Sequence, residues 1–282
     1  MNRRLSNQLF TLLSSLAALF CLLVLCFLLA VIIGQGFPAI SLDFILSPAR
    51  NFGAEGGILY QLLGSLLLVI CAGIISLPVA LGVAIYKNEY LKNSRVQQLS
   101  HLLLYVLNAV PSVVFGIFGL IFFVNILHTG LSWFVGSFIL ALMMLPTITL
   151  SCYQSINSIP HSYRETARAL GLNAWQIVTQ VVLPQGIGGA ITGLLMGLAR
   201  AIGETAPIMF IATAFSGVTL PHAINTPVSS LPTHILALAK QATQQQALSN
   251  AWGASLVLLT LVLILSSSAL ISRQYFKLRT QR

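Results

Sequence analysis

The feature that most constrains this chain is a series of apolar runs. A helix needs about 20 mostly apolar residues to cross the hydrocarbon core of a bilayer, and six runs of that length occupy residues 10–33, 58–86, 99–127, 131–150, 187–215 and 251–271. Only 7% of the 282 residues are charged and 57% are hydrophobic, whereas about a quarter are charged in soluble domains. We therefore predict an all-α, polytopic membrane protein, with six transmembrane helices in one domain spanning residues 1–282.

The charged residues indicate orientation rather than a binding surface. The formal net charge is +9, but Lys and Arg stand in ones to threes between apolar runs and do not form the basic face of a nucleic-acid binder. A cytoplasmic N-terminus places eleven basic residues inside and only Arg50 and Lys240 outside, which agrees with the positive-inside rule. The eleven are Arg3, Arg4, Lys87, Lys92, Arg95, Arg164, Arg168, Arg273, Lys277, Arg279 and Arg282. We predict that both termini are cytoplasmic.

Motifs for catalysis and metal binding are missing from the sequence. No phosphate-binding GxxxxGK[ST] loop, no GxSxG elbow and no paired-carboxylate constellation occurs. The four Cys and five His residues show no CxxC or HxxxH spacing. We expect a chain that is not an enzyme and that binds no metal and no cofactor of its own.

The longest predicted cytoplasmic loop, residues 151–186, has the pattern of two short helices. Ser158 or Ser162 is the candidate N-cap of the first helix, and Gly171 supplies the left-handed residue that ends it. Asn173 is the candidate cap of the second helix. On these residues alone, a solvated helical hairpin between two membrane spans is the alternative to a functional loop.

The same loop resembles the EAA motif of ABC-importer permeases, which reads EAA, three residues, Gly, nine residues and I-x-L-P. The matching positions are Glu165, Ala167, Gly171, Val181, Leu183 and Pro184, with Thr166 in place of the middle Ala and Pro184 as the expected end of the second helix. In that family the loop forms coupling helices that sit in a cleft of a separate ATPase subunit. The resemblance implies a type I, MetI-like permease fold in which Glu165, Thr166, Ala167 and Gly171 are the coupling positions, with the small Ala167 allowing close approach.

The fifth run contains two ionisable residues. Arg200 lies near its middle, where a lone charge costs about 2.5–3.5 kcal/mol on insertion scales, and Glu204 follows one helical turn later and partly neutralises it. At about 100° per residue, both share a face with a GxxxGxxxG stripe at residues 189–197, a pattern that lets helices approach closely. We expect one helix, kinked at Pro207, with this face turned into the bundle.

Two interpretations of this pair remain open. In the functional one, the guanidinium offers planar, bidentate donors to the oxygens of phosphate or sulfate. In the structural one, Arg200 and Glu204 only satisfy each other. We favour function because ionisable groups inside a membrane are functional candidates by default.

Longer stretches resemble the A-type permease of phosphate-specific ABC importers. They are LARAIGETAP at 198–207, VPSVVFG at 110–116, SLP at 230–232 and EGGI at 55–58. The resemblance implies a phosphate pathway that includes Arg200, Glu204, Thr205 and Ser112, in a bacterial plasma membrane, which is the inner membrane of a Gram-negative cell. For Ser112, plain helix packing is the alternative.

One feature of those relatives is missing. Leu150 stands where they carry an Arg shortly after the Leu-Pro of the fourth run. A permease for another oxyanion, sulfate or molybdate, therefore remains the alternative within the same family.

The resemblance also implies an assembly. It consists of a homologous second permease of the C type, two copies of an ATPase subunit that uses the ATP, and an external phosphate-binding protein. A stand-alone channel or secondary transporter is the rival class, but it predicts several intramembrane ionisable groups or an inverted repeat. A structural scaffold would not need Arg200 at mid-membrane.

Between the last two runs, residues 233–248 place Ile235, Leu238, Ala239 and Ala242 on one helical face. This pattern predicts a short amphipathic helix that lies at the membrane surface. Contact with a soluble binding protein is the alternative.

Overall fold

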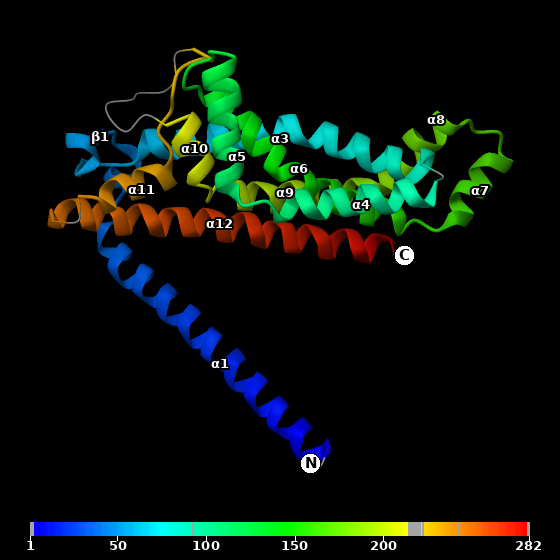
Figure 1. Ribbon diagram of the computed structural model, residues 1–282, viewed down its shortest axis with the longest axis horizontal. Helices are drawn as coiled ribbons and strands as arrows, with labels where there is room; N and C mark the ends of the chain where they lie inside the picture. Colours follow the sequence, from blue (N-terminus) through cyan, green and yellow to red (C-terminus); the bar gives the residue numbers. More distant parts are fainter. Residues whose placement is uncertain (1–2, 92, 214–220, 222, 242, 281–282) are drawn as a thin grey trace.

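The computed structural model describes residues 3–91, 93–213, 221, 223–241 and 243–280, and it is built almost entirely from helices (Figure 1). The longer helices are α1 (Arg3–Gly36), α3 (Leu59–Ile85), α4 (Ser94–Ala109), α6 (Trp133–Asn157), α9 (Leu183–Ala201) and α12 (Gln245–Thr280). The shorter ones are α2 (Leu42–Leu46), α5 (Ser112–Gly119), α7 (His161–Ala169), α8 (Ala174–Ile177), α10 (Ala206–Ile211) and α11 (Leu231–Ala239). Lys92, Phe215, Ala242 and Arg282, which enter the predicted topology, span limits or helical face, lie outside the described residues.

Short segments of other geometry complete the chain. Two-residue strands β1 (Ala49–Arg50) and β2 (Glu55–Gly56) pair antiparallel. The 3₁₀ turns are η1 (Phe37–Ala39) and η2 (Asn51–Gly53), and the π-helical segments are η3 (Tyr86–Tyr90), η4 (Leu120–Ile126) and η5 (Val178–Val182).

The predicted six spans are reached when the bent pair of α4 and α5 counts as one span. In the described residues, five helical stretches are long and apolar enough to cross a membrane, and a sixth consists of α4 and α5 with its π-helical extension, bent by 87°. The bend falls at Val110 and Pro111, and Val110 adopts an extended backbone with ψ 128°. A residue before proline is disfavoured in the helical region, so the break follows from the sequence.

The predicted fifth span is also broken, which corrects the expectation of one helix kinked at Pro207. Helix α9 ends at Ala201, and α10 begins only at Ala206, with Pro207 in its first turn. Proline lacks the N–H that the Gly203 carbonyl needs in a continuous helix. Arg200 and Glu204 therefore do not share one face of a single helix.

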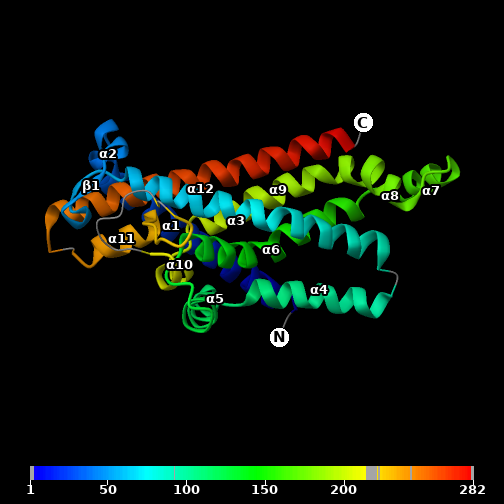
Figure 2. The ribbon, with the colours of Figure 1, turned by 90° about the horizontal axis from the view of Figure 1, so that it is seen from above.

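The core of the bundle lies between α3, α6, α9 and α12, which run side by side along the long axis (Figures 1 and 2). The glycine stripe of α9 faces α6, as predicted. A Cβ built at Gly189 would collide with Cβ of Ser155, and one built at Gly193 would lie 2.7 Å from Cβ of Ser151. The Ser151 hydroxyl donates to the Gly189 carbonyl at 2.9 Å, so the two backbones pack closely.

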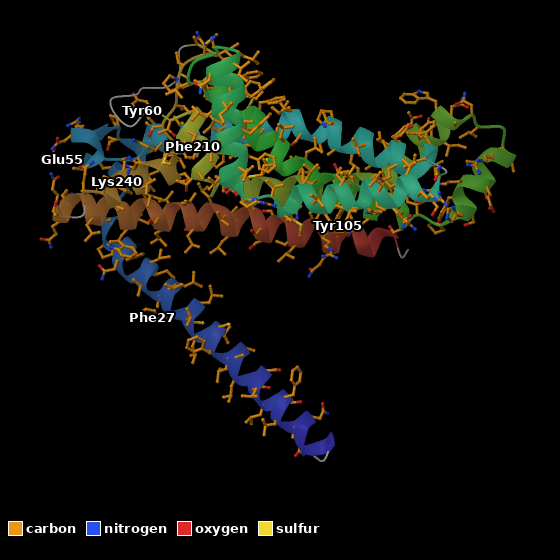
Figure 3. All side chains as sticks on the ribbon, viewed as in Figure 1. Phe27, Glu55, Tyr60, Tyr105, Phe210 and Lys240 are labelled. Carbon is orange, nitrogen blue, oxygen red and sulfur yellow. The ribbon has the colours of Figure 1, made fainter. Side chains whose placement is uncertain are left out.

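Helix α1 stands apart from the bundle (Figure 1). None of its most apolar 18-residue window is buried, and Phe27 is 67% exposed and points away from the other helices (Figure 3). It meets the bundle near its end, where a Cβ built at Gly36 would touch Trp252 and Leu256 of α12. Its apolar surface is suited to lipid or to another membrane subunit.

The predicted helix over residues 233–248 is wrong in extent and place. Helix α11 covers Leu231–Ala239, and α12 already begins at Gln245. Leu231 and Leu238 are fully buried, and the Leu231 N–H donates to Oγ of Ser65 in α3 at 2.8 Å. This helix closes the end of the bundle, where burial lowers the pKa of His234 to about 4.

The loop with the EAA-like spacing projects from the opposite end (Figures 1 and 2). It is shorter than the predicted 151–186, because α6 continues to Asn157. Pro184 does not end the second helix, since α8, η5 and α9 form one helical stretch over Ala174–Ala201. The π-helical register of η5 shifts the hydrogen bonds ahead of Pro184, so the proline is accommodated in the first turn of α9.

Gly189→Val should separate α6 from α9 and destabilise the bundle by about 1–3 kcal/mol, because the new side chain meets Ser155 and the Ser151 carbonyl. The measurement is thermal unfolding of the purified protein in detergent. Gly82→Val in α3 is the matched control, because a Cβ at Gly82 meets nothing within 4 Å. Equal melting temperatures for the two variants would contradict the close packing.

Candidate functional site

A polar contact joins the two broken spans beside their breaks. Nη1 of Arg200, in the last turn of α9, donates to Oδ1 of Asn108, in the last turn of α4, at 2.8 Å. The hydroxyl of Thr147, which follows Pro146 in α6, donates to the same oxygen at 3.1 Å. Three elements thus converge on one amide oxygen.

Arg200 and Glu204 come together despite the helix break. Nε of Arg200 lies 3.9 Å from Oε1 of Glu204, and the side chains are 34% and 17% exposed. The ion pair is therefore loose and uses only one edge of the guanidinium. With Nη1 on Asn108, the remaining N–H groups of Arg200 form no hydrogen bond in the described part of the chain.

Arg200 also borders open space. It lines a cleft of about 410 Å³ together with Met196 and Ala199 of its own helix and Ser266 and Leu270 of α12. The partly exposed guanidinium with its unused donors is suited to hold an anion, whereas the lining of the cleft itself is almost entirely apolar.

The other two predicted pathway residues lie near the breaks without joining the polar contact. Ser112 is the first residue of α5, and Thr205 directly precedes α10. Their helices cross closely, since a Cβ built at Gly116 of α5 would lie 2.9 Å from Cα of Pro207. Within the described residues, neither hydroxyl is hydrogen-bonded to Arg200 or Glu204.

Asn108 and Thr147 were missed in the sequence. The available signal was a single amide residue in the otherwise apolar segment 102–110, directly ahead of the helix-breaking Pro111. Such a residue belongs to no motif of fixed spacing, so its role is visible only from its contact with Arg200.

The local geometry of the EAA-like loop agrees with most of the prediction. Gly171 has φ +83°, the left-handed conformation that ends α7. Asn173 caps α8 in a capping box with Gln176. The first cap was predicted wrongly, because α7 is preceded by Pro160 rather than capped by Ser158 or Ser162.

The four predicted coupling residues divide into two groups. Glu165, Thr166 and Gly171 are exposed. Ala167 is only 6% exposed and belongs to the bundle's own apolar core, so its small side chain serves packing within the chain. The exposed surface of this loop also includes the apolar side chains of Leu170, 75% exposed, and Trp175, 69% exposed.

A buried ion pair fixes this loop to the bundle. Arg164 of α7 contacts Oε1 of Glu89 in η3 through Nη2 and Nε, both at 2.9 Å, and the side chains are 7% and 10% exposed. Arg164 also donates to the carbonyls of Ile156 and Ile159 at 3.1 and 2.8 Å. Helix α7 is therefore tied to the ends of both α3 and α6.

Sequence comparisons place these features in a family. The model of the "binding-protein-dependent transport system inner membrane component" family matches residues 76–282. A curated relative from Pasteurella multocida, named "phosphate transport system permease protein PstA", is 32% identical over 93% of this chain and 92% of its own.

Solved structures share the fold. A chain of a bacterial alginate ABC transporter, in complex with its periplasmic protein, superposes with a TM-score of 0.64 at 15% identity over 97% of this chain and 96% of its own. A chain of the MetNI methionine ABC transporter, in an inward-facing conformation, gives a TM-score of 0.58 at 16% identity over 76% and 93%. The predicted MetI-like permease fold is thus confirmed.

Arg164→Ala should destabilise the protein by about 3–5 kcal/mol, because it leaves the Glu89 carboxylate buried without its partner. Thermal unfolding in detergent and limited proteolysis of the 158–173 segment are the measurements. Arg168→Ala is the control, because Arg168 lies on the same helix, is exposed and forms no ion pair in the described residues. A loss of stability no larger than in this control would contradict the stabilising role of the Arg164–Glu89 ion pair.

Proposed function

Because this chain belongs to the family of binding-protein-dependent transport system inner membrane components, we propose that it forms half of the translocation pathway of an ABC importer for inorganic phosphate. The observation that carries the proposal is Arg200, a partly exposed cation at the breaks of two spans with donors left free. A cation inside a membrane is costly unless it has a role or a partner. The name of the Pasteurella multocida relative supports phosphate as the substrate.

The broken spans support a pathway at this depth. Irregular backbone at membrane depth is tolerated where it lines a cavity or packs against protein, and discontinuous helices build substrate sites in many transporters. Arg200 binds the phosphate oxygens, and Glu204 limits the positive charge so that the anion is released again. Ser112 and Thr205 line the pathway next to these two residues.

The chain is a membrane component and not itself an enzyme, and the ATP is used by a separate ATPase dimer. We assign the ATPase contact to the end of the bundle that carries α7 and α8 (Figure 1). Exposed Glu165, Thr166, Leu170 and Trp175 supply a mixed apolar and polar surface there, and large exposed apolar side chains mark protein contacts. A second, homologous permease and an external phosphate-binding protein complete the assembly.

Coupling follows from the buried ion pair. ATP binding closes the ATPase dimer and displaces α7, and the Arg164–Glu89 contact transmits this movement to α3 and α6. Because α6 packs closely on α9, the movement reaches Arg200. The spans then expose the anion site alternately to the binding protein and to the cytoplasm.

The end of the bundle that carries α7 and α8 also indicates how the protein is oriented in the membrane. Helix α12 ends at the same end of the bundle as the α7 and α8 loop (Figure 1), whereas Lys240 and Glu55 lie at the opposite end (Figure 3). With the ATPase in the cytoplasm, the C-terminus is cytoplasmic and Lys240 is external. This is the arrangement that the positive-inside rule favours for a bacterial plasma membrane.

Arg200→Ala should lower phosphate uptake by about tenfold or more, because a hydrogen bond to a charged group contributes roughly 1.5–3 kcal/mol. The measurement is ATP-driven uptake of radiolabelled phosphate by the reconstituted complex, with sulfate and molybdate as competitors. Arg95→Ala, an exposed residue at the start of α4, is the control with normal uptake. An intact wild-type complex that imports sulfate or molybdate but no phosphate would overturn the substrate assignment.

Gly171→Asp should uncouple ATP hydrolysis from uptake while the protein stays in the membrane. The site is open to solvent but has φ +83°, so a side chain adds about 1–2 kcal/mol of backbone strain and a negative charge beside the ATPase surface. Gly130→Asp is the matched control, since Gly130 also has an open position, with φ +70°, in the turn before α6. Normal ATP-driven uptake by the Gly171 variant would contradict the assignment of the coupling loop.

A further inference from the structure

The side-chain amide of Asn108 has a fixed orientation. Its oxygen accepts from Nη1 of Arg200 at 2.8 Å and from the hydroxyl of Thr147 at 3.1 Å. A guanidinium has donors and no acceptor, so Oδ1, and not the nitrogen, must face Arg200. The Nδ2 group therefore points away from both partners.

This Nδ2 group is an unused donor. It makes no hydrogen bond within the described residues and is not among the fully buried polar atoms there. Asn108 lies two residues before the break of a membrane span. Donors at that depth are costly unless a polar partner or a water-filled passage satisfies them.

The same amide thus performs two tasks on one side of a cation. Its oxygen holds the guanidinium of Arg200 in place, and its nitrogen presents N–H groups next to it. A fixed cation beside neutral N–H donors matches an oxyanion, whose several oxygens accept hydrogen bonds in different directions.

We propose that Asn108 is a substrate-binding residue of the anion site, which positions Arg200 through Oδ1 and donates from Nδ2 to an oxygen of the transported phosphate. This inference rests on the proposed function. It adds a neutral donor from the other broken span, so that the anion is held between α4 and α9.

The decisive substitution is Asn108→Asp, which is nearly isosteric. A carboxylate keeps both hydrogen bonds to Arg200 and Thr147 and strengthens the first, but it removes the N–H donors and adds a negative charge beside the substrate. If Asn108 were only structural, this variant would transport at least as well as Asn108→Ala. A binding role predicts the reverse order, with uptake lowered by about tenfold or more in Asn108→Asp.

The experiment measures KM and kcat of ATP-driven uptake in the reconstituted complex, with phosphate, sulfate and molybdate as the anions supplied. Co-purification of the ATPase and basal ATP hydrolysis report assembly. Ser100→Ala is the control, because Ser100 lies on the same helix two turns before Asn108 and its hydroxyl bonds only the Gln97 carbonyl in the described residues, so its KM should stay within about threefold of the wild type.

A second variant keeps the test valid if Asn108→Asp fails to assemble. Asn108→Ser is neutral and small, and it should raise KM by about tenfold with kcat little changed. Wild-type KM in Asn108→Ser, or wild-type uptake in Asn108→Asp, overturns the inference. Both variants are compared with the wild type on whichever anion the wild-type complex imports. If the wild type imports no phosphate, the proposed function is wrong. If the Asn108 variants transport the imported anion as the wild type does, only the role of Asn108 is wrong.

Discussion

Backbone hydrogen bonding in a hydrocarbon environment is the constraint on which this structure depends. A helix satisfies its own N–H and C=O groups, and any interruption at membrane depth must be shielded by protein or face a polar cavity. The chain contains two such interruptions, ahead of Pro111 and Pro207. They are placed together, because α5 crosses α10 where Gly116 lies against Pro207. The polar contact between Arg200 and Asn108 joins the last turns of α9 and α4, directly before the two breaks, so the proposed anion site adjoins them.

Much of the fold could be predicted because long apolar runs specify membrane helices almost by themselves. The span at 58–86 agrees with α3 within one residue at each end. Continuity was harder to predict. The run at 187–215 has helical spacing throughout, yet α9 stops at Ala201, since the effect of Pro207 reaches back to the Gly203 carbonyl. The glycine stripe was interpreted correctly because four-residue spacing is a property of one helix alone.

The site residues also divide into those that local sequence rules predict and those whose partners lie far away in the chain. Gly171 and Asn173 follow local rules of helix ends, so the sequence sufficed. Arg164 was overlooked as a structural residue because its partner Glu89 lies 75 positions earlier in the chain. Asn108 was overlooked for the same reason, since Arg200 is 92 positions away. Pairing over such distances depends on how α3, α4, α6 and α9 pack, and no spacing within one segment reports it.

The burial of the Arg164–Glu89 pair distinguishes two successive contacts. One is the proposed contact between the ATPase and the α7 and α8 loop, and the other is the ion pair that joins this loop to the bundle. At the proposed ATPase contact, exposed charges such as Glu165 interact through solvent, where ions screen interactions beyond about 8 Å at physiological ionic strength. The Arg164 and Glu89 side chains are 7% and 10% exposed, and buried pairs are screened much less. High salt is therefore expected to weaken the proposed contact with the ATPase subunit more than the ion pair inside this chain. Raising the ionic strength is therefore a way to weaken the proposed ATPase contact without breaking the Arg164–Glu89 pair.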